Sequence, residues 1–183
     1  MSIIVFDTET TGLLAVSAAD IQHQPYLIEL VALKLSQNPE GGFDLVDKLH
    51  VRCKPSIRIP DDAIKVHRIT NEMVAECGPF SSVYLDIAEF FVGCNVIVGH
   101  NALYDKMVLY YELLRIGKQL SFPWSIRTID TAEISGQYYG HRKNLQDLYI
   151  ELFGTGFSEA HSANADCVST MECFVEMRKR EMI

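Results

Sequence analysis

Near its start the chain reads Ile3-Ile4-Val5-Phe6-Asp7-Thr8-Glu9-Thr10-Thr11-Gly12-Leu13, an apolar run that leads into two acids. The apolar residues predict a buried strand over Ile3–Phe6. Because side chains alternate along a strand, Asp7 and Glu9 at its end are expected to point to the same face. Two like charges held that close repel each other unless a cation lies between them. Taken alone, however, Asp-x-Glu is more often the solvated end of a strand than a catalytic pair.

The rest of the chain predicts one mixed α/β sheet with helices on its faces. Further strands are expected at Leu27–Leu35 and Phe43–Arg52, and the turn Asn38-Pro39-Glu40-Gly41-Gly42 between them favours an antiparallel hairpin. Two short strands are expected at Asn95–Val98 and Arg127–Asp130. Helices are predicted at Asp61–His67, Asn71–Glu76, from Ser81 or Ser82 to Val92, Asn101–Ile116, Thr131–Ser135, Leu145–Phe153 and Ala163–Arg180.

Length and composition predict a single domain over residues 1–183. The chain has 183 residues, of which 48% are apolar, and this is enough for a sizeable core. No apolar run approaches the roughly 18 residues of a membrane span, and no secretory peptide is recognisable. The five cysteines have no zinc-site spacing, which is typical of reduced thiols in a cytoplasmic protein.

The charge balance restricts the way in which nucleic acid could bind. A net charge of −8 argues against a protein that coats long stretches of nucleic acid. It does not exclude an enzyme that grips only the end of a strand, because bound divalent cations would cancel the charge of clustered carboxylates.

Two further polar groups stand where helices are expected to begin. Asp105 falls in the first turn of the helix after Gly99-His100-Asn101, where the helix dipole favours an acid whatever its function. His161 and Asp166 straddle the start of the last helix. Each of these residues has an ordinary structural explanation when it is taken alone.

In combination, these positions closely resemble the DEDDh exonucleases, the family of the DNA polymerase III epsilon subunit and RNase T. Three family motifs occur in the right order, together with the segments Ile59-Pro60 and Val66-His67-Arg68-Ile69-Thr70 between the first two. Two departures are Tyr104 where the family often has Phe, and Arg68 where it often has Gly. The stretch Leu14–Pro25 is also longer than in many relatives. The three motifs are Asp7-Thr8-Glu9-Thr10-Thr11-Gly12-Leu13, Gly99-His100-Asn101-Ala102-Leu103-Tyr104-Asp105 and His161-Ser162-Ala163-Asn164-Ala165-Asp166.

The resemblance implies a ribonuclease H-like fold, a five-stranded mixed sheet with three antiparallel strands followed by parallel ones. It implies hydrolysis of nucleic-acid 3′ ends to 5′-mononucleotides with two divalent cations, Mg²⁺ or Mn²⁺. His161 would be the general base. The implied metal ligands are Asp7, Glu9, Asp105 and Asp166, and the implied substrate-binding residues are Thr10, Leu13, His67, Asn101 and Tyr104.

The sequence leaves several alternatives open. Single-stranded DNA is the favoured substrate, but an RNA-trimming enzyme would look the same, because no motif reports contact with a 2′-hydroxyl. A catalytically silent domain that recruits partners is disfavoured by the retention of all five polar site residues. A metal-dependent phosphatase is a more distant alternative. Whether the chain serves a polymerase partner, acts alone or forms a homodimer is not decided by the sequence.

Overall fold

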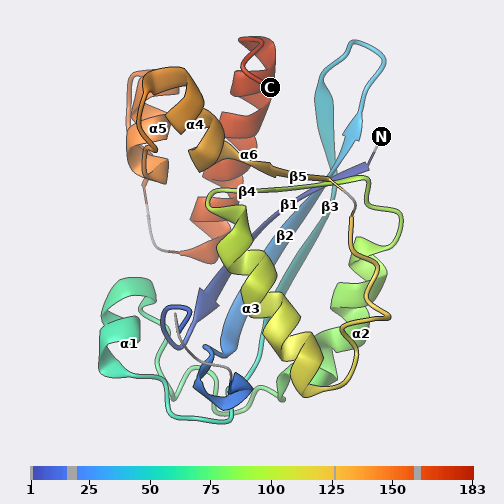
Figure 1. The fold of residues 1–183 in the computed structure, drawn as a ribbon, viewed down its shortest axis with the longest axis vertical. Coiled ribbons are helices and arrows are strands. Elements are labelled where there is room, and N and C mark those ends of the chain that lie inside the picture. Colours follow the sequence, from blue (N-terminus) through green and yellow to red (C-terminus); the bar gives the residue numbers. More distant parts are fainter. Residues whose placement is uncertain (1, 16–19, 126, 159–161) are drawn as a thin grey trace.

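The computed structural model describes residues 2–15, 20–125, 127–158 and 162–183. Its centre is a five-stranded sheet in the order β3-β2-β1-β4-β5 (Figure 1). All five predicted strands are present, and β1 and β2 are longer than predicted. The strands are β1 (Ser2–Thr10), β2 (Leu27–Gln37), β3 (Phe43–Arg52), β4 (Val96–Gly99) and β5 (Arg127–Asp130).

The sheet has the mixed topology that was expected. β1 pairs with β2 and β2 pairs with β3 in antiparallel ladders. β4 pairs with β1 and β5 pairs with β4 in parallel. The turn between β2 and β3 is closed by Asn38, whose backbone N–H donates to the Gly42 carbonyl and whose side chain accepts from the Gly42 N–H. The predicted antiparallel hairpin is therefore confirmed.

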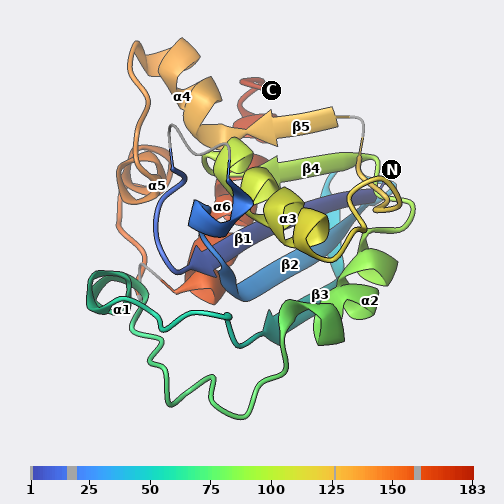
Figure 2. The ribbon, with the colours of Figure 1, turned by 60° about the horizontal axis from the view of Figure 1, so that its bottom comes forward.

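Helices cover both faces of the sheet. In Figure 2, α3 lies in front of the strands and α6 lies behind them. Among the helices of the described residues, none has both the length and the apolar character needed to cross a membrane. The helices are the single 3-10 turn η1 (Ile21–His23) and α1 (Asp61–His67), α2 (Phe80–Phe91), α3 (Ala102–Arg115), α4 (Thr131–Tyr139), α5 (Leu145–Phe153) and α6 (Ala163–Lys179).

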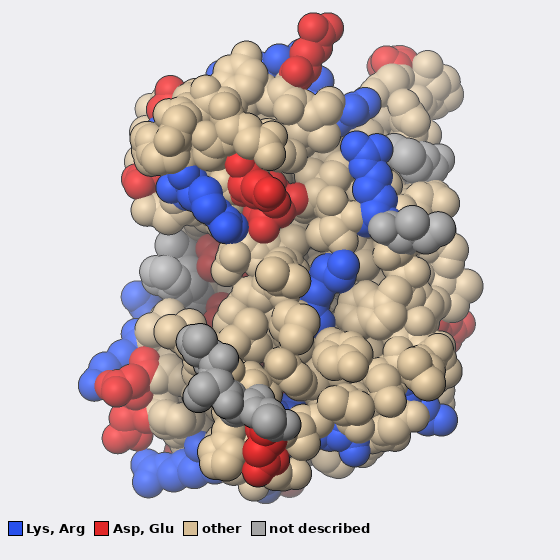
Figure 3. Space-filling view, in the orientation of Figure 1, with Lys and Arg blue, Asp and Glu red and all other residues tan. Residues whose placement is uncertain are grey.

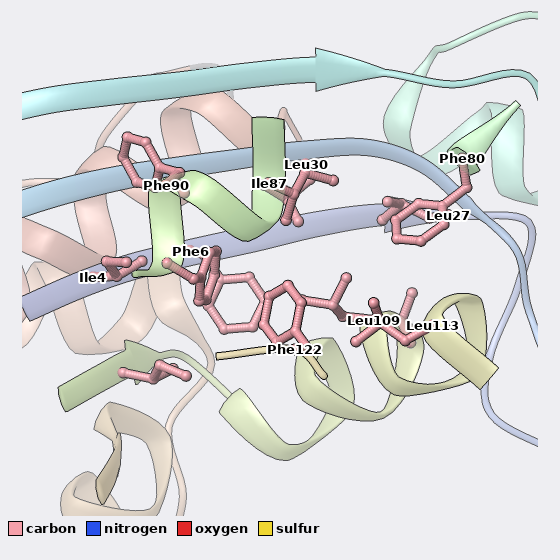
Figure 4. Packing of buried hydrophobic residues seen from close by; sticks show 14 of the residues in the cluster. Ile4, Phe6, Leu27, Leu30, Phe80, Ile87, Phe90, Leu109, Leu113 and Phe122 are labelled. Atoms are coloured by element: carbon pink, nitrogen blue, oxygen red, sulfur yellow. The ribbon is translucent and has the colours of Figure 1, made fainter. Parts of the chain in front are cut away.

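The alternation of β1 builds a separate core on each face of the sheet. Ile4 and Phe6 pack with residues of α2 and α3, as Figure 4 shows. Ile3 and Val5 face the other way and pack against α6, whose Phe174 is buried there. Because Asp7 and Glu9 continue the second set by period two, the apolar alternation of β1 directs both carboxylates to the α6 side.

One helix prediction was wrong, and the start of a second, confirmed helix differs from the prediction. The segment predicted as a helix at Asn71–Glu76 forms turns, because the Asn71 side chain bonds both the N–H and the carbonyl of Ile59 instead of supporting a helix. α2 begins directly after Pro79, not after a serine cap, and the Ser82 hydroxyl donates back to the Pro79 carbonyl within the first turn. Pro79 occupies the N-cap position with φ of −68°, the value to which its ring restricts it, and no side-chain cap bond is made there.

The helix predicted at Thr131–Ser135 continues to Tyr139. Gly136 weakens helix propensity, but it allows Arg142 to pack closely, since an added Cβ would lie 3.1 Å from the Arg142 side chain. The helix ends at Gly140, whose φ of 81° is easily adopted by glycine.

Candidate active site

Three of the predicted metal ligands meet at one end of the sheet. Asp7 and Glu9 project from β1, and Asp166 projects from the first turn of α6. One ligand oxygen from each lies within 4.8 Å of the other two. Side chains alternate between the two faces of the sheet along β1, and α6 packs on the face to which Asp7 and Glu9 point. These two features bring together carboxylates that are about 160 residues apart in the sequence.

Asp105 stands beside this group, in the first turn of α3, and is buried. Its Oδ1 atom accepts a hydrogen bond from the Thr8 backbone N–H at 3.0 Å and another from the Thr8 hydroxyl at 2.6 Å. Thr8 thereby ties the start of α3 to β1. Sequence reasoning did not assign Thr8 a role, although a threonine between two acids is the only signal that could have indicated one.

Three of the four carboxyl groups have raised pKa values, as expected for acids that are held close together without a cation. Burial, then the charges of Asp105 and Glu9, raises the pKa of Asp7 well above its ordinary value. Burial, then the charge of Asp166, raises the pKa of Glu9 to about 8. Burial raises the pKa of Asp105 to about 7, against the opposing hydrogen bonds from Thr8. A divalent cation would relieve this repulsion, and carboxylate oxygens are the ligands that Mg²⁺ and Mn²⁺ prefer. The residues present therefore fit such an ion.

A cleft of about 660 Å³ opens beside the carboxylates. It runs from the end of β1 to α1 and to the start of α3. All five predicted substrate-binding residues line it, which places them together but leaves their role in binding as a prediction. They are Thr10, Leu13, His67, Asn101 and Tyr104.

Tyr104 fixes the loop that follows β1. Its hydroxyl donates to the Gly12 carbonyl at 2.7 Å and lies 2.6 Å from the Thr10 hydroxyl. This loop presents Leu13 with 85% of its surface exposed. An apolar side chain that is so exposed at the mouth of a cleft is available to contact a ligand.

The other two lining residues are held by their backbones and neighbours. Asn101 adopts a left-handed conformation, with φ of 70°, and its N–H donates to Asp130. His67 is buried, and its Nδ1 accepts a hydrogen bond from the Ile69 N–H. Burial lowers the pKa of His67, while the Thr10 carbonyl opposes that shift.

The predicted general base, His161, lies outside the described residues. Another histidine of the same motifs, His100, has both ring nitrogens engaged in other contacts. Its Nδ1 lies 3.0 Å from the Thr131 hydroxyl and its Nε2 lies 3.1 Å from the Lys143 carbonyl. Burial lowers the pKa of His100 to about 4, so it would be a weak base.

Glu29 is a fifth acid near the cluster that sequence reasoning did not assign to the site. It lies opposite Glu9 in the β1–β2 ladder, and only 4% of its side chain is exposed. Its charge contributes to the raised pKa of both Asp7 and Glu9. A charged residue within the apolar strand Leu27–Leu35 was the available signal, because a buried charge requires a partner.

A buried ion pair holds the segment that precedes β2. Arg115 bonds Glu112 at 2.8 Å, and its Nη atoms donate to the carbonyls of Ile21, Gln24 and Pro25. Its guanidinium also stacks 3.8 Å from the centre of the Tyr26 ring. The same segment is tied to the loop after β1, since the Thr11 N–H donates to the Tyr26 carbonyl and the Tyr26 N–H donates to the Thr11 hydroxyl.

Comparisons with known proteins agree with this geometry. A family model for RNase T, described as an exonuclease, matches residues 4–174. The DNA polymerase III subunit epsilon of Pasteurella multocida (strain Pm70) is 28% identical over 176 residues, which cover 95% of this chain and 67% of that protein. The corresponding subunit of Treponema pallidum (strain Nichols) is 30% identical, with 94% of this chain and 74% of that protein covered. The chain thus spans about two thirds to three quarters of these relatives.

Solved structures show the same fold. The nuclease domain of 3′hExo, a DEDDh family member bound to rAMP, superposes with a TM-score of 0.77 at 15% identity, covering 98% of this chain and 92% of that one. Exonuclease X in complex with 5′ overhanging duplex DNA gives a TM-score of 0.60 at 18% identity, with 98% and 93% covered. The ribonuclease H-like architecture expected from the sequence is confirmed.

Proposed function

We propose, because this chain belongs to the DEDDh family of 3′→5′ exonucleases, that it releases 5′-mononucleotides from the 3′ ends of nucleic acid. The observation that carries the proposal is the meeting of Asp7, Glu9 and Asp166 within 4.8 Å, with Asp105 beside them. Residues 1–183 would form one such exonuclease domain, with single-stranded DNA as the favoured substrate.

The acidic cluster would hold two divalent cations, Mg²⁺ or Mn²⁺. Asp7 would be shared between them, Glu9 and Asp166 would complete one site, and Asp105 would support the other. When bound, such ions stabilise negative charge on the phosphate and on the leaving oxygen. Thr8 would keep the Asp105 carboxylate in place, because it donates two hydrogen bonds to Oδ1 and leaves Oδ2 for other contacts.

His161 would be the general base. A water molecule would attack the scissile phosphorus, its proton would pass to an imidazole nitrogen, and the bond to the 3′-oxygen would break. The support is sequence position: His161 lies five residues before Asp166, so it belongs to the segment that leads into α6. An unperturbed imidazole titrates near neutral pH and is suited to this transfer.

The cleft would hold the terminal nucleotide. Leu13 would contact the base with its exposed apolar side chain, and the Tyr104 ring would offer a stacking surface while its hydroxyl holds the loop. Thr10, Asn101 and His67 would complete the walls. Stacking on aromatic and apolar groups tolerates any base, so little sequence preference is expected.

RNA is the second candidate substrate. The similar solved structures include both kinds of ligand: one concerns recognition of the 3′ end of a histone mRNA stem-loop by a 3′-exonuclease, and another is a complex with 5′ overhanging duplex DNA. The similar epsilon subunits belong to DNA polymerase III, which favours DNA and a polymerase partner as the first proposals.

A matched digestion tests the proposal. Single-stranded DNA, duplex DNA and RNA of one sequence would be incubated with Mg²⁺ or Mn²⁺, and products would be separated by size and identified by mass. We expect stepwise shortening with release of 5′-mononucleotides, and no activity in excess chelator. A strand with a blocked 3′ end and a closed single-stranded circle should both resist. Rapid cutting of the circle, or release of inorganic phosphate alone, would refute the assignment.

A further inference from the structure

The edge strand β3 carries three basic side chains on the face of the sheet that holds the carboxylate cluster. Glu9 pairs with Glu29 across β1 and β2, and Glu29 pairs with Arg52 across β2 and β3. Directly paired residues point to the same face of a sheet. Arg52 therefore shares the face of Glu9, and by period two so do His50 and Lys48.

This row of side chains borders the cluster at an accessible edge. α6 packs mainly on β1, β2 and β4, so it leaves β3 at the margin (Figure 2). The Lys48 ammonium bonds the side chain of Asn164, which lies in the first turn of α6 near Asp166. The side chains of His50 and Arg52 are 41% and 35% exposed.

Glu29 fixes the orientation of the two exposed groups. Arg52 Nε donates to Glu29 Oε1 at 2.5 Å, and His50 Nε2 lies 2.8 Å from the same oxygen. Because this contact uses Nε, it does not involve the two terminal nitrogens of the Arg52 guanidinium. Those two nitrogens form the planar fork that suits a phosphate. The Arg52 side chain is 35% exposed and contacts the buried Glu29 through Nε, so this contact does not occupy the fork.

Arg52 lies within reach of a strand whose 3′ end is at the carboxylates. Neighbouring strands lie about 4.8 Å apart, so Arg52 is about 10 Å from Glu9 along the sheet. That distance is short enough for an upstream phosphate of the same strand. A local basic group would offset the repulsion between the strand and a chain with a net charge of −8. On the face shown in Figure 3, the basic side chains are scattered over a mainly uncharged surface and form no continuous patch.

We propose that Arg52 and His50, held by the buried Glu29, bind a backbone phosphate of the nucleic-acid strand upstream of the scissile bond. Lys48 adds positive charge to the same row. The site rests on the proposed function, since its ligand is the substrate strand. It recognises phosphate, which DNA and RNA share, and so it increases the affinity for the strand without distinguishing deoxyribose from ribose.

The competing explanation is structural: Arg52 could serve only to neutralise Glu29. The phosphate-binding and the structural explanations predict different effects on substrates of different length. The variant Arg52→Gln would be compared on a single-stranded oligonucleotide of about 12 nucleotides and on the p-nitrophenyl ester of thymidine 5′-monophosphate, which has no upstream phosphate. The matched control is Arg127→Gln, an exposed arginine on β5 at the opposite edge of the sheet.

For Arg52→Gln, the ratio of kcat/KM on the oligonucleotide to kcat/KM on the ester should fall about tenfold, the size expected for one charged phosphate contact. Arg127→Gln should leave that ratio unchanged. An equal loss of kcat/KM on both substrates, or no loss on either, would overturn the proposal. His50→Gln provides a second variant at a more exposed side chain if Arg52→Gln folds poorly, and a smaller fall in the same ratio is expected.

Binding gives a readout that needs no hydrolysis. Anisotropy of a labelled oligonucleotide in excess chelator would be measured over a range of salt concentrations. Arg52→Gln should weaken binding and reduce the slope of log K against log salt by about 1. Wild-type protein that hydrolysed neither substrate would refute the proposed function, and the titration would then decide this inference alone. An unchanged slope in Arg52→Gln would refute the phosphate site even if the enzyme were active.

Discussion

Thr8 and Asp105 are joined by two hydrogen bonds to a single carboxylate oxygen, at 3.0 Å from the backbone N–H and 2.6 Å from the hydroxyl. The two residues are 97 positions apart in the sequence, and their contact links the C-terminal end of β1 to the first turn of α3. Asp105 is buried, and both hydrogen bonds from Thr8 go to its Oδ1 atom. Thr8 therefore orients the Asp105 carboxylate in the site.

The first prediction concerns this link. Thr8→Val keeps the size of the side chain but removes the hydroxyl donor, and it should lower the free energy of unfolding by about 1.5–3 kcal/mol, the range for a hydrogen bond to a charged group. It should also lower kcat, since Asp105 would lose orientation. Chemical denaturation and turnover on an oligonucleotide would measure both effects. Thr8→Ser, which retains the hydroxyl, is the control, and an equal loss of kcat in both variants would contradict the interpretation.

The second prediction separates the base from the metal ligands. His161→Ala should lose about two to four orders of magnitude in turnover, the usual contribution of a general base. Its affinity for Mn²⁺ should survive, because all four carboxylates remain. Asp7→Ala should lose both turnover and Mn²⁺ affinity, because it removes the ligand that we propose is shared. Calorimetric titration with Mn²⁺ would measure the metal affinity of both variants, and single-turnover rates would measure their loss of activity.

The pH profile provides a check on the same base. Activity of the wild-type enzyme should fall as acid protonates the imidazole, and that limb should vanish in the residual activity of His161→Ala. Near-normal turnover in His161→Ala would mean that another group accepts the proton. His67 would then be the next histidine to test, since it lines the cleft whereas His100 is bonded at both ring nitrogens.

The third prediction concerns stability of the metal-free protein. The carboxyls of Glu9 and Asp105 have folded pKa values of about 8 and about 7, above their ordinary values of 4.5 and 3.8. The folded chain therefore holds protons that the unfolded chain releases. Stability from these groups is complete below their ordinary pKa and is lost as the pH rises through the folded values. The midpoint of thermal unfolding in chelator should thus decrease between pH 5 and pH 8.

Divalent cations should reverse that decrease. Mg²⁺ or Mn²⁺ binds the ionised carboxylates and so should raise the unfolding midpoint more at pH 8 than at pH 5. Glu9→Gln removes one of the titrating groups and should flatten the metal-free pH dependence. A metal-free midpoint that increased steadily from pH 5 to pH 8 would show that the acidic cluster does not govern stability in this range.

The fourth prediction concerns Arg115, which bonds Glu112 and three backbone carbonyls of the segment before β2. Arg115→Ala should destabilise the fold by about 3–5 kcal/mol, because it leaves the Glu112 carboxylate buried without its ionic partner. It should also make the segment at residues 20–26 more sensitive to proteolysis. Arg58→Ala removes a surface arginine that is 79% exposed beside Asp61, and its unfolding curve should match the wild type.

Local sequence patterns predicted the strands of the sheet and the positions of acids at the ends of strands and helices. The apolar run Ile3–Phe6, the hairpin turn at Asn38–Gly42 and the acid of the first turn of α3 were each predicted by local patterns, and the structure confirms them. These features follow from side-chain alternation, turn chemistry and helix dipoles, which act over a few residues. Local patterns failed at Asn71–Glu76, where the Asn71 side chain bonds Ile59 twelve residues away.

The spatial arrangement of those acids and their pKa values depend on contacts between distant parts of the chain. The register of β2 on β1 sets Glu29 opposite Glu9, and the register of β3 on β2 sets Arg52 opposite Glu29. The pKa of each carboxyl depends on its burial and on acids from β1, β2, α3 and α6 that no local window contains. The physical reason is that Coulomb interactions and desolvation depend on distance in space, and the long-range pairing of strands and helices alone fixes that distance.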